Sequence, residues 1–489
     1  MKKIKIEGAA FDAILLAIIR LMTTLLGIVS TMLLSKSLSL LAYGTYSQAN
    51  LVISMGTSFS IMGFADGTSY FFNKAQNDEE SQENIGTIFA LQMIIGIFLG
   101  IGILIFQNLI IAYFDNTELA GLFIYIAFRP LLNNLLSMLQ NLQISIGKAK
   151  TIAVRNIIVA VVKLLAIYLA INVFNNIQTI FLILLILDFC TVVYFWISFA
   201  ADKYNINIFK FKKQILPQIM RFCIPMGVYV LTNSLSRDID KFCIGKLGST
   251  EQLAIYTNCS AILPVDIISA AFLTVVIPIM TRYVTANDFE NGKQLFSKYI
   301  KISCLTTVTF SVALMMLSEE VILFLYGDKY LVGKSVFLLY MIVNILRFAN
   351  LSLVVSANGE TSLLMKLSIF TLILNIILNI VFYMLVGFTG PAIATVAITL
   401  LSVIWLMRRS MKILHMIWKE IFTIKELILF IVELIISGII FRYLASFMTG
   451  NGISPMITIF VAGGGMCGLV FLINLKKLCV LFREINKLK

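Results

Sequence analysis

Hydrophobic stretches of about twenty residues recur along nearly the whole chain, with short polar segments between them, and stretches of this length are typical of membrane-crossing helices. A window of about 19 residues places fourteen spans, near residues 9–34, 48–72, 85–106, 119–139, 152–172, 178–200, 217–236, 253–280, 300–318, 335–357, 362–386, 389–407, 425–446 and 454–475. The pattern therefore predicts an all-α polytopic membrane protein.

The first twelve predicted spans form two series of six that repeat short sequences. The segment from Lys36 to Tyr46 matches the segment from Lys246 to Tyr256, and the turn at Gly147 matches the turn at Gly359. An even number of spans separates the copies, so both halves have the same orientation and form a parallel repeat. We expect four regions: an N-lobe at 1–205, a C-lobe at 206–410, an amphipathic linker at 411–424, and the last two spans with a basic tail at 425–489.

The linker has a helical pattern of its own. Apolar side chains recur at helical spacing, which predicts a helix lying on the inner membrane surface: Met407, Met411, Leu414, Ile417 and Ile421.

Composition and charge support a membrane location and give an orientation. The chain is 60% hydrophobic and 13% charged, whereas soluble domains have about 25% charged residues, so a soluble enzyme and a disordered chain are excluded. Of 38 Lys and Arg residues, 26 fall on one side of the predicted spans, 7 on the other and 5 within spans. The positive-inside rule then places both termini in the cytoplasm. The net charge of +13 needs no nucleic acid to explain it.

The sequence predicts no catalytic site, metal site or cofactor. The seven cysteines lie in or beside apolar runs without metal-ligand spacing, and the single histidine, His415, lies between spans. A phosphate-binding loop of the G-x-x-x-x-G-K-[ST] type is also missing. We therefore expect a protein that is not an enzyme.

Basic residues within spans are candidates for a ligand site, because a charge in the membrane is costly unless it meets water or a partner. Arg20 shares a polar face with hydroxyl residues, and Arg129 shares one with Asn133, Gln140 and Gln143. Lys163 lies on the same helical face as Asn156. The equivalent spans of the second half carry the remaining candidates: Asn344, Arg347 and Asn350 in one, and Asn375 in the other. Lining of a shared central cavity is the expected role; salt bridges and interhelical hydrogen bonds are the alternatives.

Acidic and small residues in spans have alternative roles too. Asp188 either neutralises Lys163 or Arg129 or binds a coupling cation, and Asp266, on one face with Asn258, is a second candidate for ion coupling. Glu433 is a candidate partner of Arg442. A stripe of small residues in the second span predicts close helix packing rather than a ligand contact: Gly56, Ser60, Gly63 and Gly67.

Several motifs resemble those of the polysaccharide-assembly flippases, often called Wzx-type. The similar segments are KSLSLLAYGTYS at 36–47, GFADG at 63–67, RDIDKFCIGKLG at 237–248, LYGDKY at 325–330, ANG at 357–359 and GPAIA at 390–394. The resemblance implies two six-helix lobes that rock about a central cavity. It also implies membership of a superfamily that includes multidrug and toxin extruders and peptidoglycan-precursor flippases.

The resemblance further implies a substrate and a location. The substrate would be an undecaprenyl-diphosphate-linked oligosaccharide, moved from the inner to the outer leaflet of a bacterial cytoplasmic membrane by alternating access. Central Arg and Lys suit the diphosphate and amide side chains suit the glycan. Expected partners are this lipid-linked substrate, membrane lipids, a polysaccharide polymerase and glycosyltransferases. A cation-coupled multidrug antiporter and a peptidoglycan-precursor flippase are the alternatives.

Overall fold

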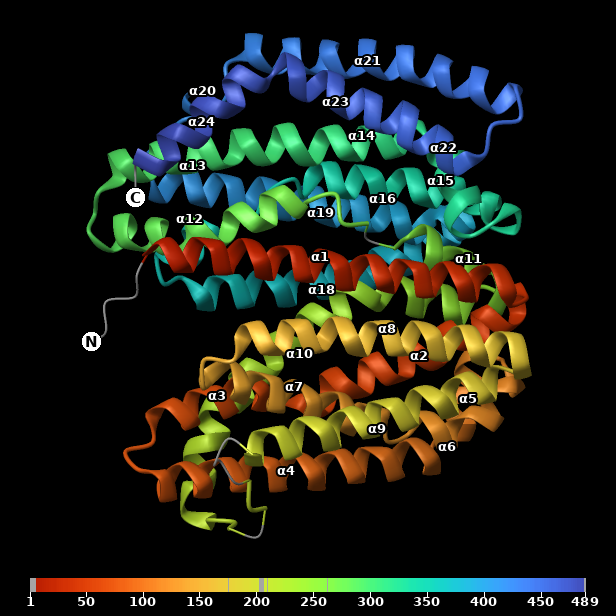
Figure 1. Ribbon diagram of the computed structural model, residues 1–489, viewed down its shortest axis with the longest axis vertical. Coiled ribbons are helices and arrows are strands. Elements are labelled where there is room, and N and C mark those ends of the chain that lie inside the picture. Colours follow the sequence, from red (N-terminus) through yellow and green to blue (C-terminus); the bar gives the residue numbers. More distant parts are fainter. Residues whose placement is uncertain (1–5, 175, 202–205, 209, 262, 488–489) are drawn as a thin grey trace. The chain divides into compact units, whose positions relative to one another are not determined.

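The computed structural model describes residues 6–174, 176–201, 206–208, 210–261 and 263–487, which form helices and no strand (Figure 1). The chain divides into two compact units. The first, here called the N-unit, is Ile18–Ala254; the second, the C-unit, is Ile255–Lys489 together with Met1–Ala17.

The N-unit begins within α1 and includes the helices up to α10. They are α1 (Ile6–Ser37), α2 (Leu40–Ile61), α3 (Phe64–Lys74), α4 (Asp78–Ile105), α5 (Gln107–Phe114), η1 (Thr117–Leu122), α6 (Phe123–Ile126), α7 (Arg129–Ser145), α8 (Ala149–Phe174), α9 (Ile177–Ala201), η2 (Lys213–Ile215) and α10 (Leu216–Leu247). Within this unit α7 packs against α2, α3, α4 and α9, so α7 is its central helix.

The C-unit begins within α11 and contains the C-terminal helices. Its elements are α11 (Thr250–Cys259), α12 (Ile267–Thr285), α13 (Phe289–Ser303), η3 (Cys304–Val308), α14 (Thr309–Met316), α15 (Ser318–Leu325), η4 (Asp328–Gly333), α16 (Lys334–Leu346), α17 (Leu353–Ala357), α18 (Thr361–Val386), η5 (Gly387–Thr389), α19 (Gly390–Ile413), α20 (Trp418–Ile421), α21 (Ile424–Gly450), α22 (Pro455–Thr458), η6 (Ile459–Gly463), α23 (Gly464–Ile473) and α24 (Leu475–Lys487). Here α21 and α23 lie along α14 (Figure 1).

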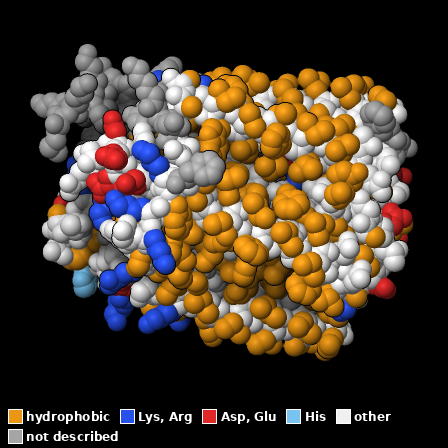
Figure 2. All heavy atoms as spheres, turned by 90° about the horizontal axis from the view of Figure 1, so that it is seen from below, with side chains coloured by type: hydrophobic (Ala, Val, Ile, Leu, Met, Phe, Trp, Pro, Cys, Tyr) orange, Lys and Arg blue, Asp and Glu red, His pale blue; other side chains and the backbone are white. Residues whose placement is uncertain are grey.

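The prediction of an all-α polytopic membrane protein is confirmed. Ten helical segments of the described chain are long and apolar enough to cross a membrane, and one of them, residues 361–413, contains both α18 and α19. Shorter apolar helices cover residues 21–37 and 275–285. Figure 2 shows the corresponding surface: hydrophobic side chains cover most of the face drawn, and Lys and Arg gather at one end of it.

Several predicted spans are broken helices, which hydrophobic periodicity does not reveal. Pro264 lies between α11 and α12, and Pro130 follows the break between α6 and α7. A proline lacks the N–H of a helical hydrogen bond and its ring clashes with the preceding turn, so it favours a break before it, although α10 and α12 continue through Pro225 and Pro278. Between α16 and α17, side-chain hydrogen bonds take the place of helical backbone bonds. The Asn350 side chain accepts hydrogen bonds from the N–H (3.1 Å) and the hydroxyl (2.7 Å) of Ser352.

The repeat found in the sequence appears in the structure as matched helix starts and turns. Ser39 caps α2 by accepting a hydrogen bond from the Ala42 N–H at 3.1 Å, and Ser249 caps α11 through the Gln252 N–H at 3.2 Å. Such caps satisfy N–H groups that the first helical turn leaves free. Gly147 and Gly359, which end the equivalent helical segments, have φ values of 84° and 76°, a left-handed backbone that glycine adopts without strain.

The predicted packing role of the small-residue stripe is also confirmed. A Cβ added to Gly56 would stand 2.9 Å from Pro130, and one added to Gly67 would stand 2.5 Å from the sulfur of Cys223. Ser60 is buried and accepts a hydrogen bond from Asn134 at 2.8 Å. These small side chains therefore let α7 and α10 approach α2 and α3 closely.

The segment after α19 differs from the expected surface helix. The helix α19 continues to Ile413, His415 has a left-handed backbone with φ of 51°, and only the four residues of α20 form a separate helix before α21. Leu414 and Ile421 are fully buried in the core of the C-unit. Their apolar spacing therefore reflects core packing rather than contact with the membrane surface.

Candidate functional site

The candidate site of the N-unit lies where α7, α8 and α9 meet. The break at Ala127 and Phe128, ahead of Pro130, makes Arg129 the first residue of α7. Lys163 and Asp188 lie near the middle of α8 and α9. Because each residue comes from a different helix, the packing of these three helices fixes the geometry of the site.

Asp188 joins the two basic residues. Its Oδ2 accepts hydrogen bonds from Arg129 Nε at 3.1 Å and Nη2 at 2.8 Å, and its Oδ1 accepts one from Lys163 Nζ at 2.5 Å. The guanidinium of Arg129 also lies 5.9 Å from the ring centroid of Phe181. Asp188 therefore pairs with both of the cations named as its candidate partners.

The three charges of this Arg129–Asp188–Lys163 cluster do not cancel, since two cations share one carboxylate. Asp188 is 2% exposed and Arg129 is 8% exposed, whereas the Lys163 side chain is 31% exposed. Arg129 Nη1 is buried and has no hydrogen-bond partner. A buried donor without a partner is costly, so the cluster combines a positive charge with unused hydrogen-bonding capacity that an anion would satisfy.

Lys163 also lines a groove of about 270 Å³ between α8 and α9. Arg155, one of the basic residues within spans that received no role in the sequence analysis, lines the same groove. It donates hydrogen bonds to Gln143 at 3.0 Å and Ser198 at 2.8 Å, and its guanidinium lies 5.3 Å from the ring centroid of Tyr194. In the sequence, Arg155 could have been recognised as a second basic residue in the predicted span of Lys163, eight residues before it.

The amide residues that share a predicted face with Arg129 have different surroundings. Asn133 is half-buried and stands 3.5 Å from the Thr57 hydroxyl. Gln140 donates a hydrogen bond to Asn156 of α8 at 3.1 Å, and Gln143 donates one to the Phe195 carbonyl of α9 at 3.1 Å. Gln140 and Gln143 thus form interhelical hydrogen bonds, which was the alternative to cavity lining.

The remaining candidates belong to the C-unit or lie outside the described side chains. Arg347 is exposed at the end of α16, and Asn375 of α18 is buried, 3.4 Å from the amide nitrogen of Asn379. Asp266 is exposed and directly precedes α12. The continuous helical face expected for Asp266 and Asn258 is wrong, because the chain leaves the helix between them. The side chain of Arg20 is not among those described.

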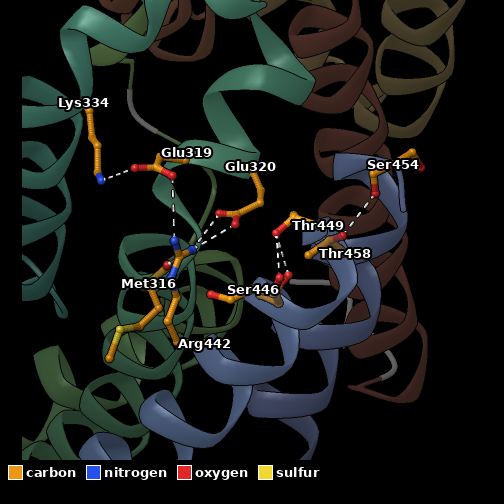
Figure 3. Close-up of polar contacts among 10 residues, drawn as sticks. Met316, Glu319, Glu320, Lys334, Arg442, Ser446, Thr449, Ser454 and Thr458 are labelled. Atoms are coloured by element: carbon orange, nitrogen blue, oxygen red, sulfur yellow. Dashed lines mark hydrogen bonds and ion pairs between the residues drawn. The ribbon is translucent and has the colours of Figure 1, made fainter. Parts of the chain in front are cut away.

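A second charged cluster, missed in the sequence, holds the C-terminal helices of the C-unit (Figure 3). Arg442 of α21 donates to Glu320 of α15 at 2.9 and 3.0 Å and to the Met316 carbonyl at 3.1 Å. Glu319 accepts a hydrogen bond from Lys334 at 2.5 Å. The expected pairing of Glu433 with Arg442 is therefore wrong.

Glu433 has a different partner, Asn474, which donates to its two carboxylate oxygens at 2.8 and 3.0 Å. Arg442 pairs with Glu320 instead. Glu320 is only 4% exposed, and a buried carboxylate is stabilised by the charged hydrogen bonds that Arg442 donates. Within the described residues, no group of three or more His, Cys, Asp or Glu side chains is placed to hold a metal ion.

Solved structures show which known folds this chain resembles. A lipid II flippase MurJ in an inward closed conformation aligns with a TM-score of 0.70 at 16% identity, covering 95% of this chain and 100% of that one. A MATE family multidrug resistance transporter of the MOP superfamily in an inward-facing conformation gives a TM-score of 0.67 at 16% identity, covering 82% and 98%. A MATE family multidrug resistance transporter in an outward-facing conformation gives a TM-score of 0.51 at 18% identity, covering 82% of this chain and 94% of that one. The chain therefore has a MurJ- and MATE-like fold.

Sequence comparisons give the family. No curated protein sequence matches the chain. A family model described as "Polysaccharide biosynthesis protein" matches residues 33–334, which is more than half of the chain. This match confirms the resemblance drawn from the short motifs, and the matched region includes the whole Arg129–Asp188–Lys163 cluster. The chain is a multi-pass membrane protein that belongs to this polysaccharide biosynthesis protein family.

Proposed function

We propose that the protein is a flippase that moves an undecaprenyl-diphosphate-linked oligosaccharide from the inner to the outer leaflet by alternating access, for assembly of a surface polysaccharide. The observation that carries the proposal is the Arg129–Asp188–Lys163 cluster, which has one more cation than anion and an unpartnered Arg129 Nη1. A diphosphate carries the charge and the acceptor oxygens that such a cluster lacks. Membership of a polysaccharide biosynthesis family supports a glycan as the rest of the cargo.

Within the cluster, the two basic residues have different tasks. Lys163 is the partly exposed cation, so it meets the diphosphate and exchanges Asp188 for a phosphate oxygen. Arg129 stays bound to Asp188 through two donors and offers Nη1 to the ligand. We assign Arg20 and Arg347 as further cations along the substrate path, and Asn133 and Asn375 as hydrogen-bonding groups for the glycan.

The membrane potential suffices as a driving force in this proposal. Moving one charge through 100 mV is worth about 2.3 kcal/mol, so two negative charges leaving a negative interior gain about 4–5 kcal/mol. Asp188 and Asp266 are the candidates for additional coupling to a cation. We place the protein in the bacterial cytoplasmic membrane with both termini in the cytoplasm, as the loop charges indicate.

The proposal is tested by Lys163→Met, which removes the exposed cation and leaves the Arg129–Asp188 hydrogen bonds in place. We expect surface polysaccharide to fall at least about tenfold, a loss of about 1.4 kcal/mol or more, while the amount of protein in the membrane stays constant. The control is Lys419→Met, which removes an exposed lysine of α20. Wild-type polysaccharide from the Lys163 variant would refute the anion-binding role.

A peptidoglycan-precursor flippase is the second candidate, because the MurJ structure covers 95% of this chain whereas the MATE structures cover 82%. Depletion of the resident lipid II flippase in cells that express this protein separates the two functions. Growth without the resident lipid II flippase would support lipid II as cargo; lysis together with normal polysaccharide supports the first proposal. A multidrug antiporter for cationic drugs is disfavoured by the positive charge of the cluster.

A further inference from the structure

A groove of about 590 Å³, lined mostly by polar residues, lies where α3 meets the C-terminal end of α7, whereas Arg129 of the charged cluster is the first residue of α7. Most of its lining comes from one face of α3, because residues three and four apart share a face. The lining residues are Asp66, Ser69, Tyr70, Asn73, Lys74, Asn141 and Ile144. The opposite face of α3, with Phe64 and Phe71, is buried in the core of the unit.

The groove has a packed aromatic ring beside exposed and half-buried polar side chains. Tyr70 is 43% exposed, yet its ring stacks on Phe222 with centroids 4.4 Å apart and meets Phe71 edge-on at 5.1 Å. The ammonium of Lys74 lies 5.5 Å from the Tyr70 centroid. The ring is therefore held in place by its neighbours while part of it faces the groove.

The polar groups keep unused hydrogen-bonding capacity. Asn73 uses one amide hydrogen on the Ser69 carbonyl at 2.8 Å, and Asn141 uses one on the Ala65 carbonyl at 2.9 Å. Each of these amides has a second N–H and a carbonyl oxygen, Asp66 supplies acceptors, and Lys74 supplies donors. Donors and acceptors thus lie side by side, with one acid and one base that offset each other in charge.

This mixture selects among classes of ligand. A phosphate would need a surplus of cations, a cationic drug would need a surplus of acids, and a lipid chain would leave the amide and charged groups of the groove without hydrogen-bond partners. A carbohydrate carries hydroxyl groups that donate and accept at once, and its ring has an apolar C–H face that packs against an aromatic side chain. We infer that the α3–α7 groove is a glycan-binding site that holds sugar residues of the lipid-linked substrate.

The inference rests on the proposed function and adds a separate contact for the sugar. On the orientation proposed above, the end of α3 lies on the cytoplasmic side, where the substrate is collected. The glycan is then held by the groove while the diphosphate is held by the Arg129–Asp188–Lys163 cluster. Cargo with a longer glycan would gain affinity from the groove, and the bare lipid diphosphate would not.

The test measures binding of two lipids to the full-length protein in lipid nanodiscs. The probes are undecaprenyl diphosphate and the undecaprenyl-diphosphate oligosaccharide extracted from the host cell. Tyr70→Ala and Asn73→Ala alter the groove, and Tyr70→Phe keeps the ring. Asn172→Ala is the matched control, because Asn172 is an exposed asparagine that also donates to the carbonyl four residues earlier, at 2.9 Å.

We expect Tyr70→Ala and Asn73→Ala to weaken binding of the oligosaccharide lipid by about tenfold and about threefold, with binding of undecaprenyl diphosphate unchanged. Tyr70→Phe should keep most of the affinity, and Asn172→Ala should match wild type. Equal binding of the oligosaccharide lipid by wild type and both groove variants would overturn the inference alone. If wild-type protein binds neither lipid, the proposed function fails. Loss of both lipids in Tyr70→Ala would indicate misfolding, and Asn73→Ala then decides.

Discussion

Asp188 is the residue on which the charged site of the N-unit depends. It is almost completely buried and takes all three of its hydrogen bonds from cations. A buried charge is tolerated when it is paired and fully hydrogen-bonded, and removal of one member of such a group leaves the others uncompensated. The sequence identified both partners of Asp188, because only a few ionisable residues occur within spans and each needs a counter-charge.

Asp188→Asn should therefore destabilise the protein by about 3–5 kcal/mol, since Arg129 and Lys163 would lose their shared anion. Thermal unfolding of the purified protein in detergent measures the loss as a lower midpoint. Glu290→Gln is the control, because Glu290, whose side chain is 80% exposed, pairs with Lys293 at 2.8 Å, and exposed pairs contribute about 1 kcal/mol or less. Adding Lys163→Met to Asp188→Asn should recover part of the stability; no recovery would contradict the charge argument.

Glu360 gives a pH dependence outside the spans. The hydrogen bonds and charge of Arg409 hold the pKa of Glu360 below its ordinary value, with a further hydrogen bond from Asn358. A carboxylate whose pKa is lowered by folding adds stability above its unfolded pKa, about 4.3, and this stability is lost as pH falls through the folded pKa. The contribution should be full at neutral pH and absent well below pH 4.

The measurement compares unfolding midpoints of wild type and Glu360→Gln. Wild type should unfold at a higher temperature at pH 7, and the two midpoints should converge as the pH falls to about 3. A constant difference between the two proteins across this range would show that the carboxylate charge has no part in the stability.

At the scale of elements, several ion pairs fasten the C-terminal helices to the rest of the C-unit. Lys301 of α13 pairs with Glu426 of α21 at 3.4 Å, Lys298 of α13 pairs with Glu484 of α24 at 3.3 Å, and the most buried contact joins α21 to α15. Arg442 of α21 reaches the buried Glu320 of α15, and Lys334 of α16 reaches the adjacent Glu319 (Figure 3). The hydrogen bond and charge of Lys334 lower the pKa of Glu319, so this carboxylate stays charged at neutral pH. The remaining contact between α21 and α14 is apolar, with Leu434 buried beside Met466 and Val470.

Arg442→Met should cost about 3 kcal/mol of stability, because Glu320 would remain buried without its partner. It should also increase proteolysis between α21 and α22, which limited digestion followed by mass spectrometry detects. Changing both residues, Arg442→Met with Glu320→Leu, should return most of the stability, because an apolar pair needs no counter-charge. A double variant as unstable as the single one would show that Arg442 acts through packing of its side chain instead.

The elements also show the limits of prediction from sequence. Hydrophobic stretches located the spans, since burial in lipid demands them. The breaks before Pro130 and around Pro264 coincide with prolines, but α10 and α12 continue through Pro225 and Pro278, so a proline alone does not locate a break. The break after α16 depends on Asn350 and Ser352 replacing helical bonds with side-chain bonds, which no apolar pattern encodes. Partners such as Glu320 for Arg442 depend on which helices pack together, and that is tertiary information.

At the scale of the whole molecule, the distribution of basic residues predicts the orientation. The last turns of α19 and the loop that follows contain Arg408, Arg409, Lys412 and Lys419, whereas the loop between α21 and α22 at 451–454 has no basic residue. The first loop should face the cytoplasm and the second should face outward. The tail after α23, with Lys476, Lys477 and Arg483, should be cytoplasmic as well.

Reporter fusions measure this orientation. Green fluorescent protein fused after Lys419 or at the C-terminus should fluoresce, and alkaline phosphatase fused after Asn451 should be active, since each reporter works on only one side of the membrane. Active phosphatase after Lys419 would reverse the proposed orientation and, with it, the cytoplasmic placement of the α3–α7 groove.

The matched turns at Gly147 and Gly359 also indicate that the two halves shared a fold before the charged site arose. Lys163 and Asn375 stand at the same distance along the chain from these two glycines, so one position became a partly exposed cation in one half and a buried amide in the other. The serine caps and glycine turns persist in both copies. A gene duplication followed by divergence explains this pattern. The caps and turns needed for folding were kept in both halves, whereas the charge at the Lys163 position was gained or lost in one half only.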